Sequence, residues 1–244
     1  MKNYRAKIYK HYSSNGSKNL IPIAIDGFKS RGPFFQDIID NHFPKDKRIK
    51  ILEVGCGYGA FGYLIQKNEY KSYLGVDGSQ EQVEGAKRLG VSNIILMNLV
   101  DSLKSTKNDS LDLLIAIDVI EHFSKEELSD LIDEFYRVLK KGGKIITHQP
   151  NGSSPFGGSI RYGDFTHELA FTENSISQIF LSSGFVDVSS FEDKPITHGF
   201  KSYIRLFLWI FLVKPLYKSL LIIESGGVDK NIVLTKNFVT IVRK

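Results

Sequence analysis

The segment from Ile51 to Gly59 constrains the fold of this chain more than any other part of the sequence. It reads Ile-Leu-Glu-Val-Gly-Cys-Gly-Tyr-Gly, so a short apolar run ends in three alternating glycines. Such a run is typical of a buried parallel strand, and the glycines permit a sharp turn that brings the backbone close to a bound molecule. Glu53, at the mouth of this turn, would repel a pyrophosphate but accept hydrogen bonds from an amine or a hydroxyl. The segment therefore predicts a strand that ends at a ligand.

Composition limits the classes of protein that fit this chain. Its 244 residues are 42% hydrophobic, which is enough for one elaborated domain with a single core. The net charge is +5, but 32 basic residues are offset by 27 acidic ones, so the surface is mixed and a nucleic-acid partner is disfavoured. Cys56, the only cysteine, lies inside the glycine turn, which excludes an internal disulfide and a cysteine zinc cluster. These features favour a reducing cytoplasm.

Strand and helix patterns alternate from Ile49 to His148, and this alternation predicts an α/β fold with a doubly wound parallel sheet. The expected strands are Lys50–Val54, Ser72–Asp77, Ile94–Met97, Leu111–Ile117 and Gly143–His148. The expected helices are Ala60–Lys67, Gln80–Leu89 and Lys125–Leu139. After Pro150, a helix at Glu173–Ser183 and strands at Phe185–Phe191 and Phe238–Val242 are expected to complete the sheet.

Four regions follow from this pattern. Residues 1–48 form an N-terminal arm with a helix at Pro33–His42, and they lack the continuous apolar core of a secretion signal. Residues 49–193 form the core, residues 194–231 a helical insertion, and residues 232–244 the last strand. We therefore expect one domain with additions at both ends of its core.

The segment from Tyr203 to Ile223 is the most apolar part of the insertion. Arg205, Lys214, Pro215 and Lys218 interrupt it, and its longest apolar piece is much shorter than the roughly 20 residues of a membrane span. We expect no bilayer crossing. Two alternatives remain for this segment: a helix buried against the core, or an interfacial helix whose aromatic and basic residues lie near lipid headgroups.

A second acid, Asp77, ends the expected second strand about 20 residues after the glycine turn. A carboxylate there can accept hydrogen bonds from both hydroxyls of a ribose. The alternative is a cap for the following helix, but Ser79 can serve as that cap and leave Asp77 free. The residues from Gly57 to Gly62 also match the GxGxxG pattern of nicotinamide enzymes, although this pattern alone is weak.

Four motifs in order narrow the choice: Leu52-Glu53-Val54-Gly55-Cys56-Gly57-Tyr58-Gly59, Val76-Asp77, Asp118-Val119-Ile120-Glu121-His122 and Arg137-Val138-Leu139-Lys140-Lys141-Gly142-Gly143. Together they resemble the class I S-adenosylmethionine-dependent methyltransferases, over residues from about 49 to 150. The resemblance implies a Rossmann-like, seven-stranded and mostly parallel sheet whose last strand is antiparallel. It also implies S-adenosyl-L-methionine as cofactor, across the carboxyl ends of the first, second and fourth strands.

The resemblance implies roles for particular residues. The implied cofactor-binding residues are Glu53, Gly55, Cys56, Gly57, Gly59, Asp77, Gly78, Ser79, Asn98, Leu99 and Asp118. Among them, Glu53 would lie near the amino group of the cofactor and Asp77 would hold its ribose, while Asp118 would face the methionine portion. Adenine would meet the segment from Met97 to Asp101. An acid commonly follows the third strand in this family, whereas this chain has Asn98-Leu99-Val100-Asp101, so the adenine contact is either Asn98 or Asp101.

The N-terminal arm supplies further candidates. Arg31 has two interpretations: an exposed arginine, or a guanidinium fork that reaches the carboxylate of the cofactor. Tyr4, Tyr9 and Tyr12 either close the arm over the cofactor or simply anchor it.

Histidines are the candidate bases for a hydroxyl acceptor, because imidazole titrates nearest to neutral pH. His122 follows the fourth strand and is either the base or part of the turn into the next helix. His148 ends the fifth strand and is the weaker candidate. His167 lies in a segment, Asp164 to Thr172, that resembles one placed over the acceptor in many of these enzymes, and its alternative is stacking on a phenylalanine. No pair of histidines has metal-ligand spacing, so we expect no metal.

The layout of the C-terminal addition is similar to that of methyltransferases of bacterial surface-polysaccharide and lipid-linked glycan pathways. This resemblance implies O-methyl transfer to a sugar, or a group on a sugar, of a glycan precursor in the cytoplasm at the inner face of the membrane. Two alternatives remain: a methyltransferase for a quinone, lipid or other small molecule, and a cofactor-binding protein without catalysis.

Overall fold

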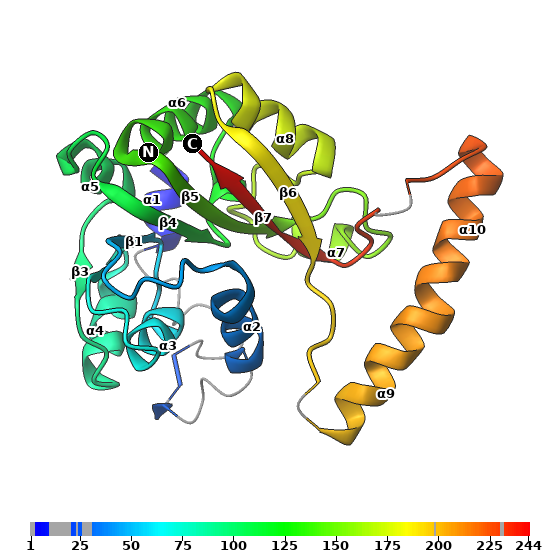
Figure 1. Ribbon diagram of the computed structural model, residues 1–244, viewed down its shortest axis with the longest axis horizontal. Helices are drawn as coiled ribbons and strands as arrows, with labels where there is room; N and C mark the ends of the chain where they lie inside the picture. The colour runs from blue at the N-terminus through cyan, green and yellow to red at the C-terminus, as the bar shows by residue number, and fades with distance from the viewer. Residues whose placement is uncertain (1–2, 10–20, 23, 26–30, 198, 230–231) are drawn as a thin grey trace.

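A computed structural model describes residues 3–9, 21–22, 24–25, 31–197, 199–229 and 232–244 of the chain. A twisted sheet forms the centre of the molecule, helices cover both of its faces, and a long helical arm stands at one side (Figure 1). Tyr12 lies outside the described residues, so its predicted position over the cofactor stays a prediction.

The sheet has seven strands in the order β3-β2-β1-β4-β5-β7-β6. Their bounds are β1 Ile51–Val54, β2 Tyr73–Asp77, β3 Ile94–Leu96, β4 Leu111–Ile117, β5 Leu139–Pro150, β6 Val186–Glu192 and β7 Asn237–Arg243. Neighbouring strands from β3 to β5 are parallel, and β7 is antiparallel to both β5 and β6. The predicted doubly wound sheet with an antiparallel last strand is confirmed.

Two layers of helices cover this sheet (Figure 1). One layer holds α2 (Gly32–His42), α3 (Ala60–Lys67) and α4 (Gln80–Arg88), and the other holds α5 (Leu99–Ser105), α6 (Lys125–Val138) and α8 (Glu173–Ser182). The remaining helical elements are α1 (Asn3–Tyr9), η2 (Ile120–His122), α7 (Gly158–Arg161), α9 (Phe200–Leu208), η3 (Trp209–Val213) and α10 (Lys214–Ser225).

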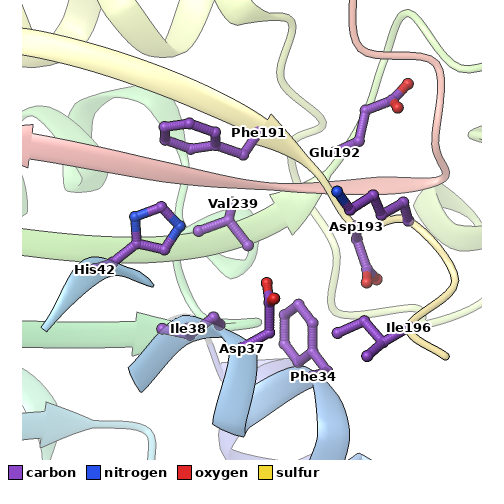
Figure 2. Close-up of a pocket in the computed structure, with 10 residues that line it drawn as sticks. Phe34, Asp37, Ile38, His42, Phe191, Glu192, Asp193, Ile196 and Val239 are labelled. Atoms are coloured by element: carbon purple, nitrogen blue, oxygen red, sulfur yellow. The ribbon is translucent and has the colours of Figure 1, made fainter. Parts of the chain in front are cut away.

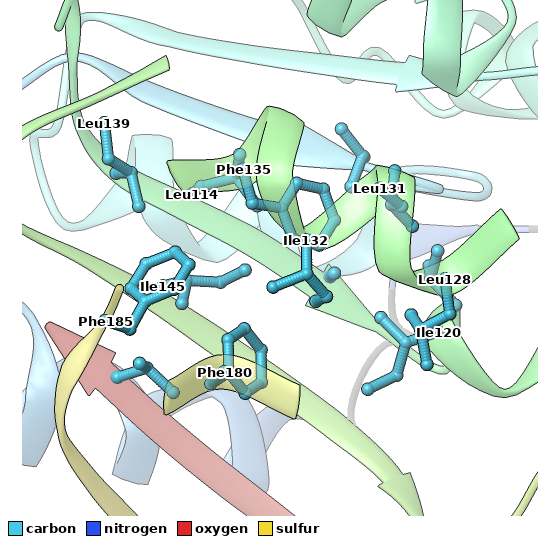
Figure 3. Packing of buried hydrophobic residues seen from close by; sticks show 14 of the residues in the cluster. Leu114, Ile120, Leu128, Leu131, Ile132, Phe135, Leu139, Ile145, Phe180 and Phe185 are labelled. Atoms are coloured by element: carbon cyan, nitrogen blue, oxygen red, sulfur yellow. The ribbon is translucent and has the colours of Figure 1, made fainter. Parts of the chain in front are cut away.

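Helix α6 shows how the sequence pattern forms the core. The five apolar residues at helical spacing, Leu128, Leu131, Ile132, Phe135 and Leu139, are each 3% exposed or less, and they pack between the sheet and α8 (Figure 3). Ser124 caps the helix and, with Glu127, forms a reciprocal capping box that satisfies two free backbone N–H groups. This prediction is confirmed, with the exception that Leu139 already begins β5.

The pattern of apolar residues in the sequence did not predict the short helices. The N-terminal arm contains α1, and α5 lies in the adenine segment, where Asn98 caps it. Each is 7 residues long, which gives too few turns for a helical period to stand out. Strand β5 begins at Leu139, four residues before the predicted start, because Leu139 pairs with Leu111 before a shift in register.

Elements α9, η3 and α10 form one continuous helix, Phe200–Ser225, which we call the outer helix. It stands away from the sheet at the right of Figure 1. Its 18-residue window with a mean hydropathy of 1.9 is 0% buried, so the alternative of a helix buried against the core is wrong. Apolar residues occur around its whole circumference. The helical period of the sequence therefore could not predict whether one face of this helix packs against the core.

The length argument against a membrane span also fails. The interrupting charges and Pro215 do not break the helix, whose 26 residues extend for about 39 Å. Within the described residues this is the one helix long and apolar enough to cross a membrane, judged by length and composition alone.

Candidate active site

The glycine turn lies at the carboxyl end of β1, where three glycines adopt left-handed backbone angles. Gly55, Gly57 and Gly59 have φ angles of +69°, +55° and +78°, which side chains with a Cβ atom rarely adopt. At Gly55 a Cβ atom would lie 2.5 Å from Cγ2 of Val119, a residue of the loop after β4. The turn is therefore specific for glycine at this position for both conformational and steric reasons.

Asp77 fixes this turn to the end of β2. One carboxylate oxygen accepts the backbone N–H of Gly57 and the other accepts that of Ser79, both at 2.8 Å. Ser79, not Asp77, provides the side-chain cap of α4, as expected. Burial raises the pKa of Asp77, and the two N–H donors oppose that rise. Each oxygen keeps a lone pair for a further donor, so the carboxyl group fits a ribose as well as the turn.

Glu53 lies under the turn and not at its mouth. Its side chain is buried, and its Oε2 accepts a hydrogen bond of 2.5 Å from the hydroxyl of Tyr73. Burial raises the pKa of Glu53 to about 8, against the lowering effect of that hydrogen bond. The tyrosine ring fits because Gly75 has no side chain: a Cβ atom there would lie 2.6 Å from the Tyr73 oxygen. At neutral pH the carboxyl group is therefore mostly protonated.

Cys56 is buried beside Glu53, and this burial, together with the nearby carboxylates, raises the pKa of its thiol well above the usual value. A protonated, buried thiol is a poor nucleophile. The side chain thus serves as a small apolar residue of the turn.

Asn98 and Leu99 lie next to Asp77 at the same edge of the sheet, because the N–H of Met97 donates to the Asp77 carbonyl at 3.0 Å. The side-chain oxygen of Asn98 accepts the N–H of Val100 at 2.9 Å and so caps α5. Beyond Asp77, Gly78 leaves open space, since a Cβ atom built there would meet nothing within 4 Å. This edge is open where the adenosine was predicted.

A chain of ionic contacts crosses the end of β4. Asp118, with a φ angle of +55°, accepts a hydrogen bond of 3.0 Å from Arg31 and another from Nδ1 of His148. Nε2 of His148 lies 3.4 Å from a carboxylate oxygen of Asp193. Arg31 is therefore anchored on Asp118, at the place where both were predicted to meet the methionine part of the cofactor.

These contacts decide the charge of His148. Burial alone would lower its pKa, but the adjacent carboxylates of Asp118 and Asp193 raise it to about 9. Burial works in the opposite direction on Asp118, and the charges of His148 and Arg31 outweigh it and hold its pKa well below the usual value. His148 is thus a cation at neutral pH and does not suit the role of a base.

The other two histidines meet beside the loop after β4. The rings of His122 and His167 have centroids 4.7 Å apart, and Nε2 of His167 lies 4.0 Å from Oε1 of Glu121. The backbone carbonyl of Glu121 accepts hydrogen bonds from the N–H groups of Glu168 and Leu169, at 2.8 and 3.0 Å, and so holds the segment that carries His167. The sequence named both histidines but could not show that they lie together.

Burial controls the charges in this group. It lowers the pKa of His122 to about 4, with a smaller contribution from His167. Burial, together with the charge of Asp118, raises the pKa of Glu121 well above its usual value. Since His122 is neutral at pH 7, it offers a lone pair.

Helix α1 covers this group. Tyr9 has its ring 6.1 Å from that of His122, and the hydroxyl of Tyr4 donates to Glu168. Arg5, which the sequence did not single out, is 3% exposed and binds Glu127 and Glu168 at 2.8 and 3.1 Å. No sequence signal separates this arginine from the other basic residues of the arm.

A shallow hollow continues the site toward β6, where α2 faces the ends of β6 and β7 (Figure 2). It is lined by aromatic and acidic side chains that include Phe34, Phe191 and Asp193. Since Asp193 also contacts His148, and the Phe34 ring lies 5.2 Å from that of His148, the hollow adjoins the ionic chain.

Comparisons with known proteins agree with this geometry. Residues 52–147 match the sequence family described as a methyltransferase domain. O-methyltransferase 3 of Dictyostelium discoideum is 24% identical over 215 residues, which are 79% of this chain and 49% of that protein. The chain thus spans about half the length of this relative.

Solved structures share the fold. A SAM-dependent methyltransferase from Archaeoglobus fulgidus has a TM-score of 0.65 at 19% identity, over 98% of this chain and 99% of that one. Phosphoethanolamine N-methyltransferase 2 of Haemonchus contortus, in complex with S-adenosyl-L-methionine, has a TM-score of 0.59 at 16% identity, over 97% of this chain and 60% of that one.

Residues 52–147 therefore form a methyltransferase domain, and the chain has the fold of solved S-adenosylmethionine-dependent methyltransferases. The similar proteins named above include an O-methyltransferase and a phosphoethanolamine N-methyltransferase, so the acceptor has to be argued from this chain's own residues.

Proposed function

We propose that this protein transfers the methyl group of S-adenosyl-L-methionine to a hydroxyl group of a sugar, or of a group on a sugar, in a bacterial surface-glycan precursor. The observation that carries the proposal is the position of two groups at one edge of the sheet. The glycine turn with Asp77 lies at the ends of β1 and β2, and His122 and His167 lie beyond the end of β4. Parallel strands end at a common edge, which lets a cofactor and an acceptor meet there.

On the cofactor side we assign the binding roles to groups that the fold already fixes. Asp77 accepts the ribose hydroxyls, and the turn from Gly55 to Gly59 lies under the methionine part. Asn98 and Leu99 border the adenine, with Gly78 and Ser79 beside the adenosine. Glu53 accepts the amino group from below, while Arg31, held by Asp118, binds the carboxylate of the cofactor.

When bound, the cofactor supplies a methyl group that its sulfonium makes electrophilic, and a bond from carbon to the acceptor oxygen replaces the bond from carbon to sulfur. The protein has to position the hydroxyl and promote loss of its proton. We assign activation of the hydroxyl to His167 and His122. His148 is excluded from this role because it is already protonated at neutral pH.

The outer helix supports a membrane-linked acceptor. Phe207 and Phe211 are 60% and 66% exposed, and Lys201 and Arg205 are exposed cations near the start of the helix. An exposed apolar helix with flanking cations is typical of an element that lies in the interface of an anionic membrane. We propose that this helix holds the enzyme at the inner, cytoplasmic face of the membrane, where lipid-linked glycan precursors are exposed.

Incubation with cofactor labelled in its methyl group tests the proposed acceptor. The protein is incubated with an extract of its source cells, which is then separated into nucleotide-sugar, lipid-linked glycan and quinone pools. We expect label in a sugar of one of the first two pools, and much less with His167→Ala. Label in a quinone or phospholipid would favour the alternative methyltransferase. Cofactor binding without transfer to any pool would favour a non-catalytic protein.

Flotation with vesicles tests the membrane contact. We expect the protein to float with vesicles that contain about 30% anionic phospholipid, and Phe207→Glu/Phe211→Glu to reduce the bound fraction at least about tenfold. Tyr162→Glu is the control, because Tyr162 is an even more exposed aromatic residue outside the outer helix. Equal binding by both variants would contradict an interfacial role, and resistance to alkaline extraction would indicate a spanning helix.

A further inference from the structure

Three side chains that can each bind a metal ion converge beside the loop after β4. Glu121, His122 and His167 each offer one donor atom, and these atoms lie within 4.8 Å of one another. His167 is 45 residues away from His122 in the chain, so no ligand spacing marked the group in the sequence. The sequence for this reason predicted no metal.

Hydrogen bonds fix which nitrogen of each imidazole carries a lone pair. Nδ1 of His167 lies 2.9 Å from the carbonyl oxygen of Ile160, which can only accept, so Nδ1 carries the proton and Nε2 the lone pair. This Nε2 is the atom that lies 4.0 Å from Glu121 Oε1.

The same reasoning applies to His122 through Thr166. The hydroxyl of Thr166 donates to a carboxylate oxygen of Asp164 at 2.6 Å and therefore has no proton left for His122. Nδ1 of His122, 2.9 Å from that hydroxyl oxygen, must donate to it. Nε2 is again left with the lone pair. Histidines that bind metals usually donate their other ring N–H to a carbonyl or a carboxylate in this way, which orients the ring.

The carboxyl group of Glu121 supplies the independent sign of a missing ligand. Glu121 is 1% exposed, and its Oε2 has no hydrogen-bond partner in the described structure. A buried carboxyl oxygen without a partner is costly, and a cation is one of the few partners that offset this cost. The residue with the orphaned oxygen thus belongs to the same group as His122 and His167.

We propose that Glu121, His122 and His167 bind a divalent transition-metal cation. Two imidazole nitrogens and one carboxylate oxygen are a donor set that suits Zn²⁺, Mn²⁺ or Fe²⁺. Donor atoms bound at about 2.1 Å lie about 3.4 Å apart in a tetrahedral site. The separation of His167 and Glu121 is 4.0 Å and all three donor atoms lie within 4.8 Å of one another, so the side chains have to move closer together to bind one cation.

Three protein ligands leave at least one coordination position open, and a hydroxyl bound there loses its proton more readily. This role in acceptor activation rests on the proposed O-methyl transfer, whereas binding of the cation does not. The cation would explain how two histidines with fixed lone pairs act on one hydroxyl.

Cobalt and manganese are suitable probes of the site. Tag-free protein is freed of metal with a chelator and titrated with CoCl₂, and absorption bands in the visible region report the coordination of Co²⁺. MnCl₂ titration followed by electron paramagnetic resonance gives the stoichiometry. We expect one equivalent of either metal to bind. We expect Glu121→Gln and His167→Gln each to weaken binding at least tenfold while the far-ultraviolet circular dichroism stays that of the unmodified protein.

Four further variants separate a metal site from a merely structural group. Thr166→Val keeps all three ligands but removes the acceptor for His122 Nδ1, and should weaken binding about 10- to 100-fold, whereas Thr166→Ser should restore it. His42→Gln, at the end of α2, should leave metal binding unchanged. Asp77→Asn should leave it unchanged too while it weakens cofactor binding, which distinguishes failure of this proposal from failure of the proposed function. Absence of binding, or equal binding by His167→Gln and the unmodified protein, would overturn the inference.

Discussion

Asp77 fixes the glycine turn and is also the residue to which we assign the ribose of the cofactor. Its oxygens accept the N–H groups of Gly57 and Ser79, at the edge of the sheet where we propose that the cofactor binds. The sequence predicted the second role from the position of the acid. It could not show the first, because the partner N–H groups come together only when β1 and β2 pair in register.

Asp77→Asn is expected to weaken cofactor binding at least tenfold, or by about 1.4 kcal/mol. The amide NH₂ group would face a backbone N–H, donor against donor, so the turn would lose one of its two anchors. Isothermal titration calorimetry with S-adenosyl-L-methionine measures the change. Asp130→Asn, on the exposed face of α6, serves as the control and should bind normally. Unchanged affinity in Asp77→Asn would rule out the ribose assignment.

Glu53 makes the stability of the protein depend on pH. Its pKa is about 8 in the folded state because of burial, whereas the unfolded chain has the ordinary value near 4.5. Since the folded state holds the proton more tightly, protonation of Glu53 stabilises the folded protein. This stabilisation is complete below the lower pKa and is lost as the pH rises toward 8. Above that pH, Glu53 no longer changes the free energy of unfolding with pH.

We therefore expect the free energy of unfolding to fall between pH 5 and pH 8, and to fall less in Glu53→Gln, which stays neutral. The difference between the two curves should be on the order of 4 kcal/mol. Urea denaturation at several pH values measures it. Parallel curves for both proteins would show that Glu53 is already ionised in the folded protein.

At the scale of elements, some helices are stabilised by their own sequence and others by contacts with the rest of the protein. Helix α6 has its own amphipathic period and its own cap, and both are visible in the sequence. Helix α1 has only seven residues, and a helix this short is not stable by itself in water. Its position depends on Arg5, which binds one carboxylate of the α6 cap and one of the segment that carries His167.

Arg5→Met should therefore release α1 while the sheet stays folded. Methionine keeps the apolar stem but leaves Glu127 and Glu168 without their cation. We expect the amide hydrogens of α1 to exchange at least about tenfold faster, because opening this helix costs less free energy. Hydrogen exchange followed by mass spectrometry tests this. Lys7→Met, at an exposed position of the same helix, should leave the rates unchanged. Equal protection in all three proteins would mean that other contacts hold α1.

At the scale of the whole molecule, the outer helix is an excursion from a complete sheet. The chain leaves the sheet after β6 and returns beside the same point, since the N–H of Leu234 donates to Glu192 Oε1 at 3.2 Å. Contacts of the outer helix with the body include the ion pair of Lys214 with Glu192, at 2.9 Å, and the rings of Tyr217 and Phe156, whose centroids are 5.6 Å apart. The core does not depend on the outer helix.

Replacement of residues 196–229 by a short glycine-serine linker should accordingly leave the fold intact. We expect a change in Tm of no more than about 3 °C, and an affinity for S-adenosyl-L-methionine within about twofold of the normal value, because the removed helix buries no core residue. Binding to vesicles should be lost. Differential scanning calorimetry and titration calorimetry provide both measurements. A large loss of stability would show that the helix is part of the folded core.

The sequence by itself determined the class of fold and the position of the glycine turn, because strands and helices carry their own periods and because a left-handed turn demands glycine at fixed positions. The tertiary structure decided what depends on contacts between distant residues. It placed His167 beside Glu121 and His122, buried Glu53 against Tyr73, made His148 a cation between two carboxylates, and left the outer helix uncovered. Proximity, burial and charge are properties of the packed chain, and no local pattern encodes them.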